Sequence, residues 1–189
     1  MRTTLQALWL FAPLLVSAAL SGAVIRLGWW RALARPIDGG ATIRGKRVFG
    51  DSKTWRGVVT AIVGSVAGVA LQRLAHGTVP AWLEVIDYGA ASPLLLGAAL
   101  GVGATAGELP NSFVKRRLGI APGKTTSGAW SVVFFVWDQV DLVVGSWPLV
   151  ALFARPTAPL VAASFVLTLV VHPAVAFVGW AIGARKTAR

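Results

Sequence analysis

The sequence contains no cysteine, and only 7 of its 189 residues are acidic. The lack of cysteine excludes disulfide bonds and thiolate-ligated metal centres. Charged residues make up 13% of the chain, which is about half of the roughly 25% found in soluble domains. Hydrophobic residues make up 56%, and the mean hydropathy is +0.69. This composition excludes an ordinary soluble domain and indicates an integral membrane protein.

Long apolar runs predict the architecture, because a membrane-spanning helix needs about 20 apolar residues. Five runs stand out, at residues 5–25, 58–74, 92–107, 129–153 and 159–182. The third is short and rich in glycine, which favours packing against other helices over contact with lipid. The fourth is longer than one span requires, so its aromatic start either lies along the interface or re-enters the membrane, with the span beginning near Asp138. We predict an all-α integral membrane protein with five transmembrane helices in a single polytopic domain, residues 1–189.

Lysine and arginine are distributed unevenly around these runs. Of the 18 in the chain, 15 lie in the predicted loops 26–57 and 108–128 or in the C-terminal tail. Loops rich in lysine and arginine stay on the cytoplasmic side. We therefore expect the N-terminus outside, the C-terminus in the cytoplasm, and both long loops facing the cytoplasm from the cell (inner) membrane. The net charge of +11 is then explained by the basic loops on the cytoplasmic side, and we expect no nucleic-acid partner.

The longest polar stretch, residues 38–57, combines closely spaced glycines, several cations and two acids. Glycine lets the backbone approach a ligand closely, and lysine and arginine side chains bind phosphate groups. This stretch is therefore a candidate polyphosphate site. A solvated positive loop that only fixes the membrane orientation is the alternative.

Asp138 and Asp141 are spaced i and i+3, so on a helix they share one face. Acidic side chains at membrane depth are costly and face a cavity or a partner, and two carboxylates repel each other unless a cation lies between them or one is protonated. Mg²⁺ fits this requirement, because it is held by one or two carboxylates together with substrate phosphates. A structural network with arginines of the basic loops is the alternative, and the spacing alone does not decide between them.

The segment 108–117 supplies a third acid, Glu108, and three consecutive cations. If a helix resumes at Pro110, then Ser112, Lys115 and Arg116 fall on one side of it. This set suits a metal–polyphosphate complex, and it equally suits a basic cluster that attracts anionic lipid headgroups at about 1 kcal/mol per residue. Both interpretations hold together if a lipid phosphate is the substrate.

The two histidines add little to this picture. We expect His76 to be a solvated loop residue and His172 to be a packing or hydrogen-bonding residue rather than a ligand.

Three motifs in this order resemble the CDP-archaeol synthase family, whose members are small five-span relatives of the CDP-diacylglycerol synthases. They are FGDSKTWRG at 49–57, GELPNSFVKRRLG at 107–119 and DQVD at 138–141, with a Pro-Gly pair at 122–123. The resemblance covers residues 36–145. It implies a cytidylyltransferase that uses CTP, Mg²⁺ and a membrane lipid phosphate to form a CDP-lipid and pyrophosphate.

The resemblance also implies roles for individual residues. Mg²⁺ ligands would be Glu108, Asp138 and Asp141. Catalytic residues would be Asp138, Asp141, Lys53 and Lys115. Substrate-binding residues would be Asp51, Thr54, Arg56, Asn111, Ser112, Arg116 and Arg117.

Two positions depart from the wider superfamily, since Glu108 stands where aspartate is usual and Ser52 where glycine is common. The connection from Pro122 to Asp138 is longer and more aromatic than archaeal enzymes lead one to expect. An archaeal-type ether lipid phosphate and a phosphatidic acid-like lipid, the latter in a bacterial member, both remain open as substrates. A small membrane transporter or lipid-handling protein without catalytic activity is the alternative function. Assembly into a homo-oligomer is left open by the sequence.

Overall fold

The computed structural model describes residues 1–122, 124 and 128–181. This part of the chain contains five long helices: α1 (Arg2–Arg26), α2 (Trp55–Ala75), α3 (Pro93–Arg117), α4 (Ala129–Val150) and α5 (Ala158–Ala181). The remaining regular elements are short, comprising the antiparallel hairpin β1 (Thr42–Ile43) and β2 (Lys46–Arg47) and the 3₁₀ turns η1 (Arg31–Leu33) and η2 (Ala81–Leu83). The predicted all-α class is confirmed. The hairpin was not predicted, because its strands are too short to produce an alternating pattern.

Four helices within the described residues are long and apolar enough to cross a bilayer, namely α1, α2, α4 from Trp130 onward, and α5. Helix α3 is not among them, because its glycines and its polar second half lower its hydropathy. The fifth span and the orientation in the membrane remain predictions. The C-terminal basic residues used for that prediction, Gly123 and the last residue of the run 159–182 lie outside the described residues.

The third predicted run continues further than expected. The sequence predicts a helix that ends near Gly107 and a loop over 108–128, and this is wrong for residues 108–117, because α3 continues through Pro110 to Arg117. An internal proline removes one backbone hydrogen bond, which neighbouring helices can compensate in a membrane protein. The three cations in the last turn also favour the negative end of the helix dipole. The polar candidates of this segment are therefore held on a rigid helix. Residues 129–150 likewise form one continuous helix, and the position of its aromatic start relative to the membrane interface stays a prediction.

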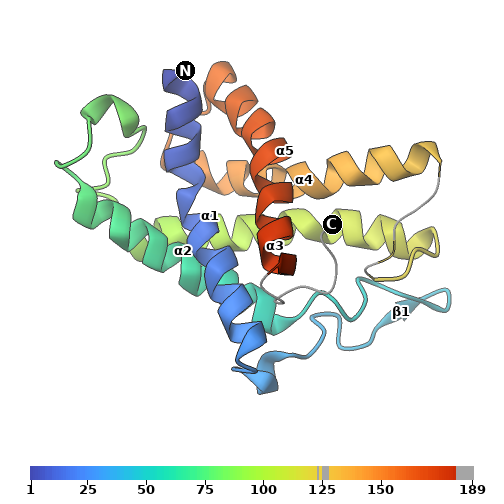
Figure 1. The fold of residues 1–189 in the computed structure, drawn as a ribbon. Helices are drawn as coiled ribbons and strands as arrows, with labels where there is room; N and C mark the ends of the chain where they lie inside the picture. The colour runs from blue at the N-terminus through green and yellow to red at the C-terminus, as the bar shows by residue number, and fades with distance from the viewer. Residues whose placement is uncertain (123, 125–127, 182–189) are drawn as a thin grey trace.

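Helix α3 lies at the centre of the fold, with α2 on one side and α4 running antiparallel to it on the other (Figure 1). Its glycines explain how close the neighbours come. A Cβ atom at Gly97 or Gly101 would overlap the α2 backbone, and one at Gly107 would overlap the carbonyl oxygen of Asp141 on α4. Small residues let helices approach closely where lipid supplies no hydrophobic driving force. The expected packing of the third run against other helices is therefore observed.

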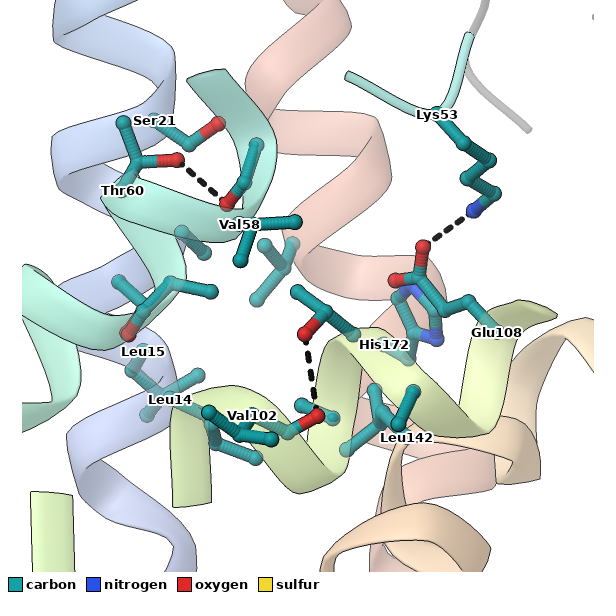
Figure 2. Close-up of a pocket in the computed structure, with 18 of the residues that line it drawn as sticks. Leu14, Leu15, Ser21, Lys53, Val58, Thr60, Val102, Glu108, Leu142 and His172 are labelled. Carbon is teal, nitrogen blue, oxygen red and sulfur yellow. Dashed lines mark hydrogen bonds and ion pairs between the residues drawn. The ribbon is translucent and has the colours of Figure 1, made fainter. Parts of the chain in front are cut away.

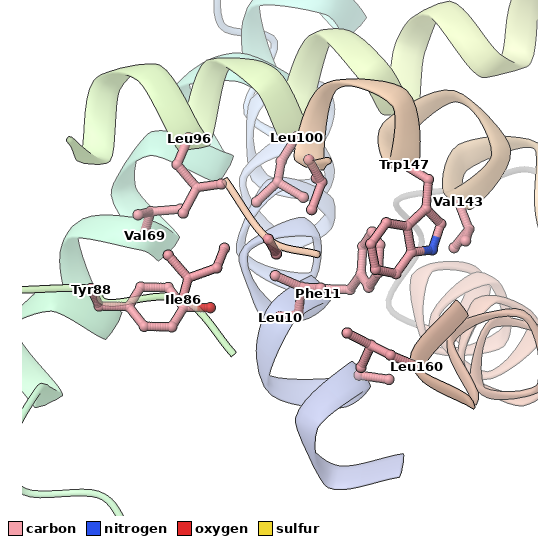
Figure 3. Packing of buried hydrophobic residues seen from close by; sticks show 13 residues of the cluster. Leu10, Phe11, Val69, Ile86, Tyr88, Leu96, Leu100, Val143, Trp147 and Leu160 are labelled. Carbon is pink, nitrogen blue, oxygen red and sulfur yellow. The ribbon is translucent and has the colours of Figure 1, made fainter. Parts of the chain in front are cut away.

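The buried apolar core joins α1, α3, α4 and α5 (Figure 3). Phe11 and Trp147 pack edge to face with their ring centroids 5.7 Å apart, a favoured geometry for aromatic pairs. The indole N–H of Trp147 donates to the hydroxyl of Ser164 at 2.8 Å, so this buried polar group is satisfied. The core fixes α5 against α1 and α4, and so it fixes the wall of the cavity described below.

Candidate active site

Asp38 organises the loop between α1 and α2. Its side chain is only 2% exposed and accepts hydrogen bonds from the guanidinium of Arg47 at 2.6 Å and from the backbone N–H groups of Phe49 and Gly50 at 3.0 and 3.1 Å. Burial alone would raise the pKa of this carboxyl group, but the hydrogen bonds outweigh it and hold the pKa well below its usual range. The acid therefore acts on the loop's own backbone. It fixes the segment that leads into Lys53.

Arg117 fixes the same loop to the end of α3. Its guanidinium donates to the backbone carbonyls of Ile43 at 2.6 Å, Lys46 at 2.8 Å and Arg47. In return the Lys46 ammonium donates to the carbonyl of Arg117 at 2.7 Å. The planar fork of an arginine suits several acceptors at once. The sequence predicts that Arg117 binds substrate; in the structure its two terminal nitrogens hold the hairpin.

Lys53 lies where the loop meets α3, and its ammonium forms an ion pair with Glu108. Burial would lower the pKa of Lys53, but the carboxylate of Glu108, with those of Asp141 and Asp138 contributing, outweighs burial and raises it. The next residue, Thr54, caps α2 by accepting a hydrogen bond from the Gly57 N–H at 3.2 Å. A cap of this kind fixes the start of a helix. The three acids that the sequence predicts as metal ligands, Glu108, Asp138 and Asp141, therefore all lie near Lys53, just before α2.

Asp138 and Asp141 are brought together by an amide from α3. The Nδ2 atom of Asn111 donates to Asp138 at 2.7 Å and to Asp141 at 3.1 Å. Lys115, one helical turn further along α3, pairs with Asp138, and its ammonium lies 5.4 Å from the ring centroid of Phe134. Asn111 and Asp141 are 2% and 4% exposed. The predicted sharing of one face by the two aspartates is thus realised at the α3–α4 contact.

Arg116 is buried, although it carries a full guanidinium. Its Nε and Nη1 atoms make no hydrogen bond within the described residues, and its aliphatic stem lies beside Gly50 and Pro122. A buried donor without an acceptor is costly, so this side chain is suited to receive an anion. Ser112 is buried on the same helix.

The donor set at the α3–α4 contact fits a hard cation. Asp141 Oδ1 and Asn111 Oδ1 are both buried and accept no hydrogen bond in the described structure. Carboxylate and amide oxygens are ligands that Mg²⁺ accepts, alongside substrate phosphates. No group of three or more His, Cys, Asp or Glu side chains is arranged to hold an ion within the described residues. Glu108 instead faces Lys53. The candidate ligands that lie closest to one another are therefore Asp138, Asp141 and Asn111.

A cavity of about 980 Å³ opens beside these groups. Figure 2 shows Lys53 and Glu108 at one end, with Leu14, Leu15 and Val102 at the other. The polar end is lined by Asp51, Ser52, Lys53, Thr54, Arg56 and Glu108. The apolar end is lined mainly by α1 and α5. The cavity therefore has the shape of a site for a molecule with a charged head and an apolar body.

Most of the sequence-predicted candidates meet in this region. The cavity is lined by five of them: Asp51, Lys53, Thr54, Arg56 and Glu108. The α3–α4 contact next to it holds Asn111, Lys115, Asp138 and Asp141. Sequence reasoning missed the organising role of Asp38, whose signal was its place at the start of the glycine-rich stretch. It also set aside His172, which lines the cavity.

Comparison with known proteins identifies the family. A model of the CarS-like family, described as CDP-archaeol synthase, matches residues 1–188. A CDP-archaeol synthase of Methanosphaerula palustris is 39% identical over 79% of this chain and 87% of its own length. One from Thermococcus onnurineus is 34% identical over 92% of this chain and 87% of its own length. A solved structure described as an intramembrane enzyme for archaeal membrane lipid biosynthesis superposes with a TM-score of 0.63 and 27% identity, covering 89% of this chain and 90% of that one.

Fold, site and relatives together define a multi-pass membrane enzyme of the CTP-dependent nucleotidyltransferase class. Within that class, the chain belongs to the CarS-like CDP-archaeol synthase family. The resemblance stated from the motifs is thereby confirmed, and the transporter alternative is set aside because this is a family of enzymes.

Proposed function

We propose that this protein transfers the cytidylyl group of CTP to an archaeal-type ether lipid phosphate, giving a CDP-lipid and pyrophosphate. The observation that carries the proposal is the cavity, whose polar end holds Lys53 and Glu108 and whose apolar end follows α1 and α5. An amphiphile fits such a space with its phosphate at the polar end and its chains at the other. The relatives named CDP-archaeol synthase support the ether lipid over a phosphatidic acid-like substrate.

The nucleotide fits on the other side of Lys53. Lys115 and Arg116 lie on consecutive positions of α3, and the buried guanidinium of Arg116 has donors available for an anion. The backbone at Gly50 has a φ of +89°, which favours glycine, and it lies against the stem and Nε of Arg116. We assign the binding of the CTP triphosphate to these two cations.

The reaction requires positioning and charge neutralisation more than acid–base chemistry. An oxygen of the lipid phosphate attacks the α-phosphorus of CTP, a new P–O bond forms, and the bond to the β-phosphate breaks as pyrophosphate leaves. The attacking phosphate is already largely anionic at neutral pH, so no general base is needed. Lys53 and Lys115 hold the two phosphates near each other and offset the charge that moves to the leaving group.

Mg²⁺ would be held by Asp138 and Asp141, with Glu108 near the lipid side. When bound, it would supply positive charge to the phosphate oxygens. Within the chain, Asn111 orients the two aspartates, and the ammonium groups of Lys115 and Lys53 offset the negative charge of the acids. These pairs keep the carboxylates in place at the α3–α4 contact.

We further propose that the site faces the cytoplasm, where CTP is made. The basic loop 26–57 supports this orientation by the positive-inside rule. The ion pairs of Lys53 with Glu108 and of Lys115 with Asp138 join the loop before α2, the second half of α3 and the first half of α4, so these candidate residues belong to one region.

The test is pyrophosphate release by the purified protein with CTP and Mg²⁺, using an unsaturated archaeal-type ether lipid phosphate and phosphatidic acid in parallel. Release with the ether lipid phosphate that stops on chelation is the expected result. Release with phosphatidic acid alone would overturn the substrate assignment, and no release with either lipid would overturn the reaction.

Asp138→Ala and Asp141→Ala should each abolish turnover while the protein still inserts in the membrane. Retained activity in either variant would remove that aspartate from the proposed metal site.

A further inference from the structure

His172 is the only titratable side chain of α5 in its described residues. It lines the cavity together with Leu167, Val171 and Val175 of the same helix. In Figure 2 its imidazole lies at the end of the cavity where Glu108 and Lys53 meet, away from the leucines of α1. The imidazole therefore stands at the boundary between the polar and the apolar parts of the cavity.

The imidazole of His172 is a polar group within an apolar helix. Polar side chains within a membrane-spanning helix are costly, and they face a cavity or a polar partner. Helix α5 is otherwise composed of apolar and small residues with a few hydroxyl groups. The hydroxyl groups of Ser164 and Thr168 bond to backbone carbonyls of Val161 and Gln139, which are structural roles. His172 is the side chain of α5 that Figure 2 shows at the charged end of the cavity, beside Glu108.

The position of this ring matches one requirement of the reaction. The lipid phosphate must stop at a depth where its oxygen reaches the α-phosphorus, and the apolar chains must begin just below it. Lys53 and Arg56 reach the cavity from the loop side. A donor from α5 would contact the same phosphate from the chain side, so that the group is held between the two. Imidazole can donate a hydrogen bond in either protonation state.

We propose that His172 donates a hydrogen bond to the phosphate of the lipid substrate and fixes the depth at which this phosphate lies. The inference rests on the proposed function, since it deepens the description of the same site. It assigns a substrate-binding role to a helix that contributes to none of the three sequence motifs. It also predicts that the role concerns the lipid and not the nucleotide.

The experiment compares His172→Leu and His172→Gln with His76→Gln, in which the other histidine is changed. His76 is a matched control because it contacts Glu84 in the loop after α2, at 2.8 Å, and lines no part of the cavity. The KM for the unsaturated ether lipid phosphate, the KM for CTP and the kcat are measured for each variant by pyrophosphate release. A hydrogen bond to a charged group corresponds to roughly a 10-fold to 100-fold change in affinity. We expect His172→Leu to raise the lipid KM by that factor and to leave the CTP KM unchanged. The glutamine variant should recover part of the loss, because its amide can also donate.

Binding without turnover gives a second readout. The thermal shift produced by the lipid phosphate is compared with the shift produced by the same lipid lacking its phosphate, both without CTP and Mg²⁺. The wild type should be stabilised more by the phosphate form, and His172→Leu should lose that difference. Equal lipid KM values in an active wild type and His172→Leu would overturn the inference and leave the proposed function intact. A parallel rise in both KM values with a lower melting temperature would also overturn it, because that is the pattern of a structural residue. A wild type without CTP-dependent turnover would instead refute the proposed function.

Discussion

The amide of Asn111 bonds to two carboxylates at once, and no part of that role depends on contact with substrate. It donates to both Asp138 and Asp141 from a buried position on α3. Residues that orient metal ligands in this way change metal affinity or activity by about 10-fold to 100-fold when removed. We expect Asn111→Ala to lower turnover by that factor and to raise the Mg²⁺ concentration needed for half-maximal rate. Pyrophosphate release as a function of Mg²⁺ measures both.

Gln139→Leu is the control for that prediction, because Gln139 on α4 is also buried but its side-chain amide donates within its own helix, to the carbonyl of Phe135. Its rate and Mg²⁺ dependence should match the wild type. A wild-type Mg²⁺ dependence in Asn111→Ala would show that the two aspartates need no orienting group.

Asp38 makes the stability of the loop depend on pH. Its pKa in the folded protein is held below the ordinary value of 3.8, so the unfolded state binds the proton more readily. The stabilisation is therefore complete above that ordinary value and is lost as the pH falls through the folded value. Asp38→Asn should lower the melting temperature at pH 7, because hydrogen bonds to a charged group contribute about 1.5–3 kcal/mol each. The difference from the wild type should shrink below pH 4. A constant difference across the acid range would contradict the assignment.

At the scale of elements, the β1–β2 hairpin is held to α3 by Arg117. If this residue bound phosphate as a point charge, Arg117→Lys would keep most of the activity. Because the guanidinium fork bonds three carbonyls of the hairpin, lysine should not replace it. We expect Arg117→Lys and Arg117→Ala to impair turnover to a similar extent, and protease cleavage within residues 38–50 to become faster in both. Retained activity in the lysine variant would instead favour the predicted role of Arg117 in binding substrate.

The sequence predicted the long helices and most of the candidate residues that the structure brings together, and the exceptions have physical causes. Asp138 and Asp141 were recognisable because their i, i+3 spacing and their cost at membrane depth are local properties. The roles of Asp38 and Arg117 depend on contacts with backbone atoms, within the loop for Asp38 and about 70 residues away for Arg117, and such contacts carry no sequence pattern. A helix that resumes at Pro110 was one possibility, and α3 instead continues through Pro110, between α2 and α4. His172 was set aside because a single histidine beside a proline gives no sign of the cavity it faces.

At the scale of the whole molecule, one helix carries both the packing and the chemistry. The glycines of α3 let α2 pack closely against one side of it and α4 against the other. Its second half carries Asn111, Lys115 and Arg116. Helices α1 and α5 cross this central layer and line the apolar end of the cavity (Figure 1). The binding space for the lipid is thus formed where two sets of helices meet, and the charged groups lie at a single end of it.

That arrangement requires the loop 26–57 and the loop after α2 to face opposite sides of the membrane, which the absence of cysteine makes simple to test. Ala41→Cys and Thr78→Cys each place one thiol at an exposed position, the first in the basic loop and the second between α2 and α3. With a membrane-impermeant maleimide, we expect Thr78→Cys to react in intact cells and Ala41→Cys to react only after the cytoplasmic face is opened. The opposite pattern would invert the orientation and place the proposed CTP site outside. Labelling of both thiols from one side would mean an even number of spans between the two positions, and it would remove α2 from the membrane-spanning set.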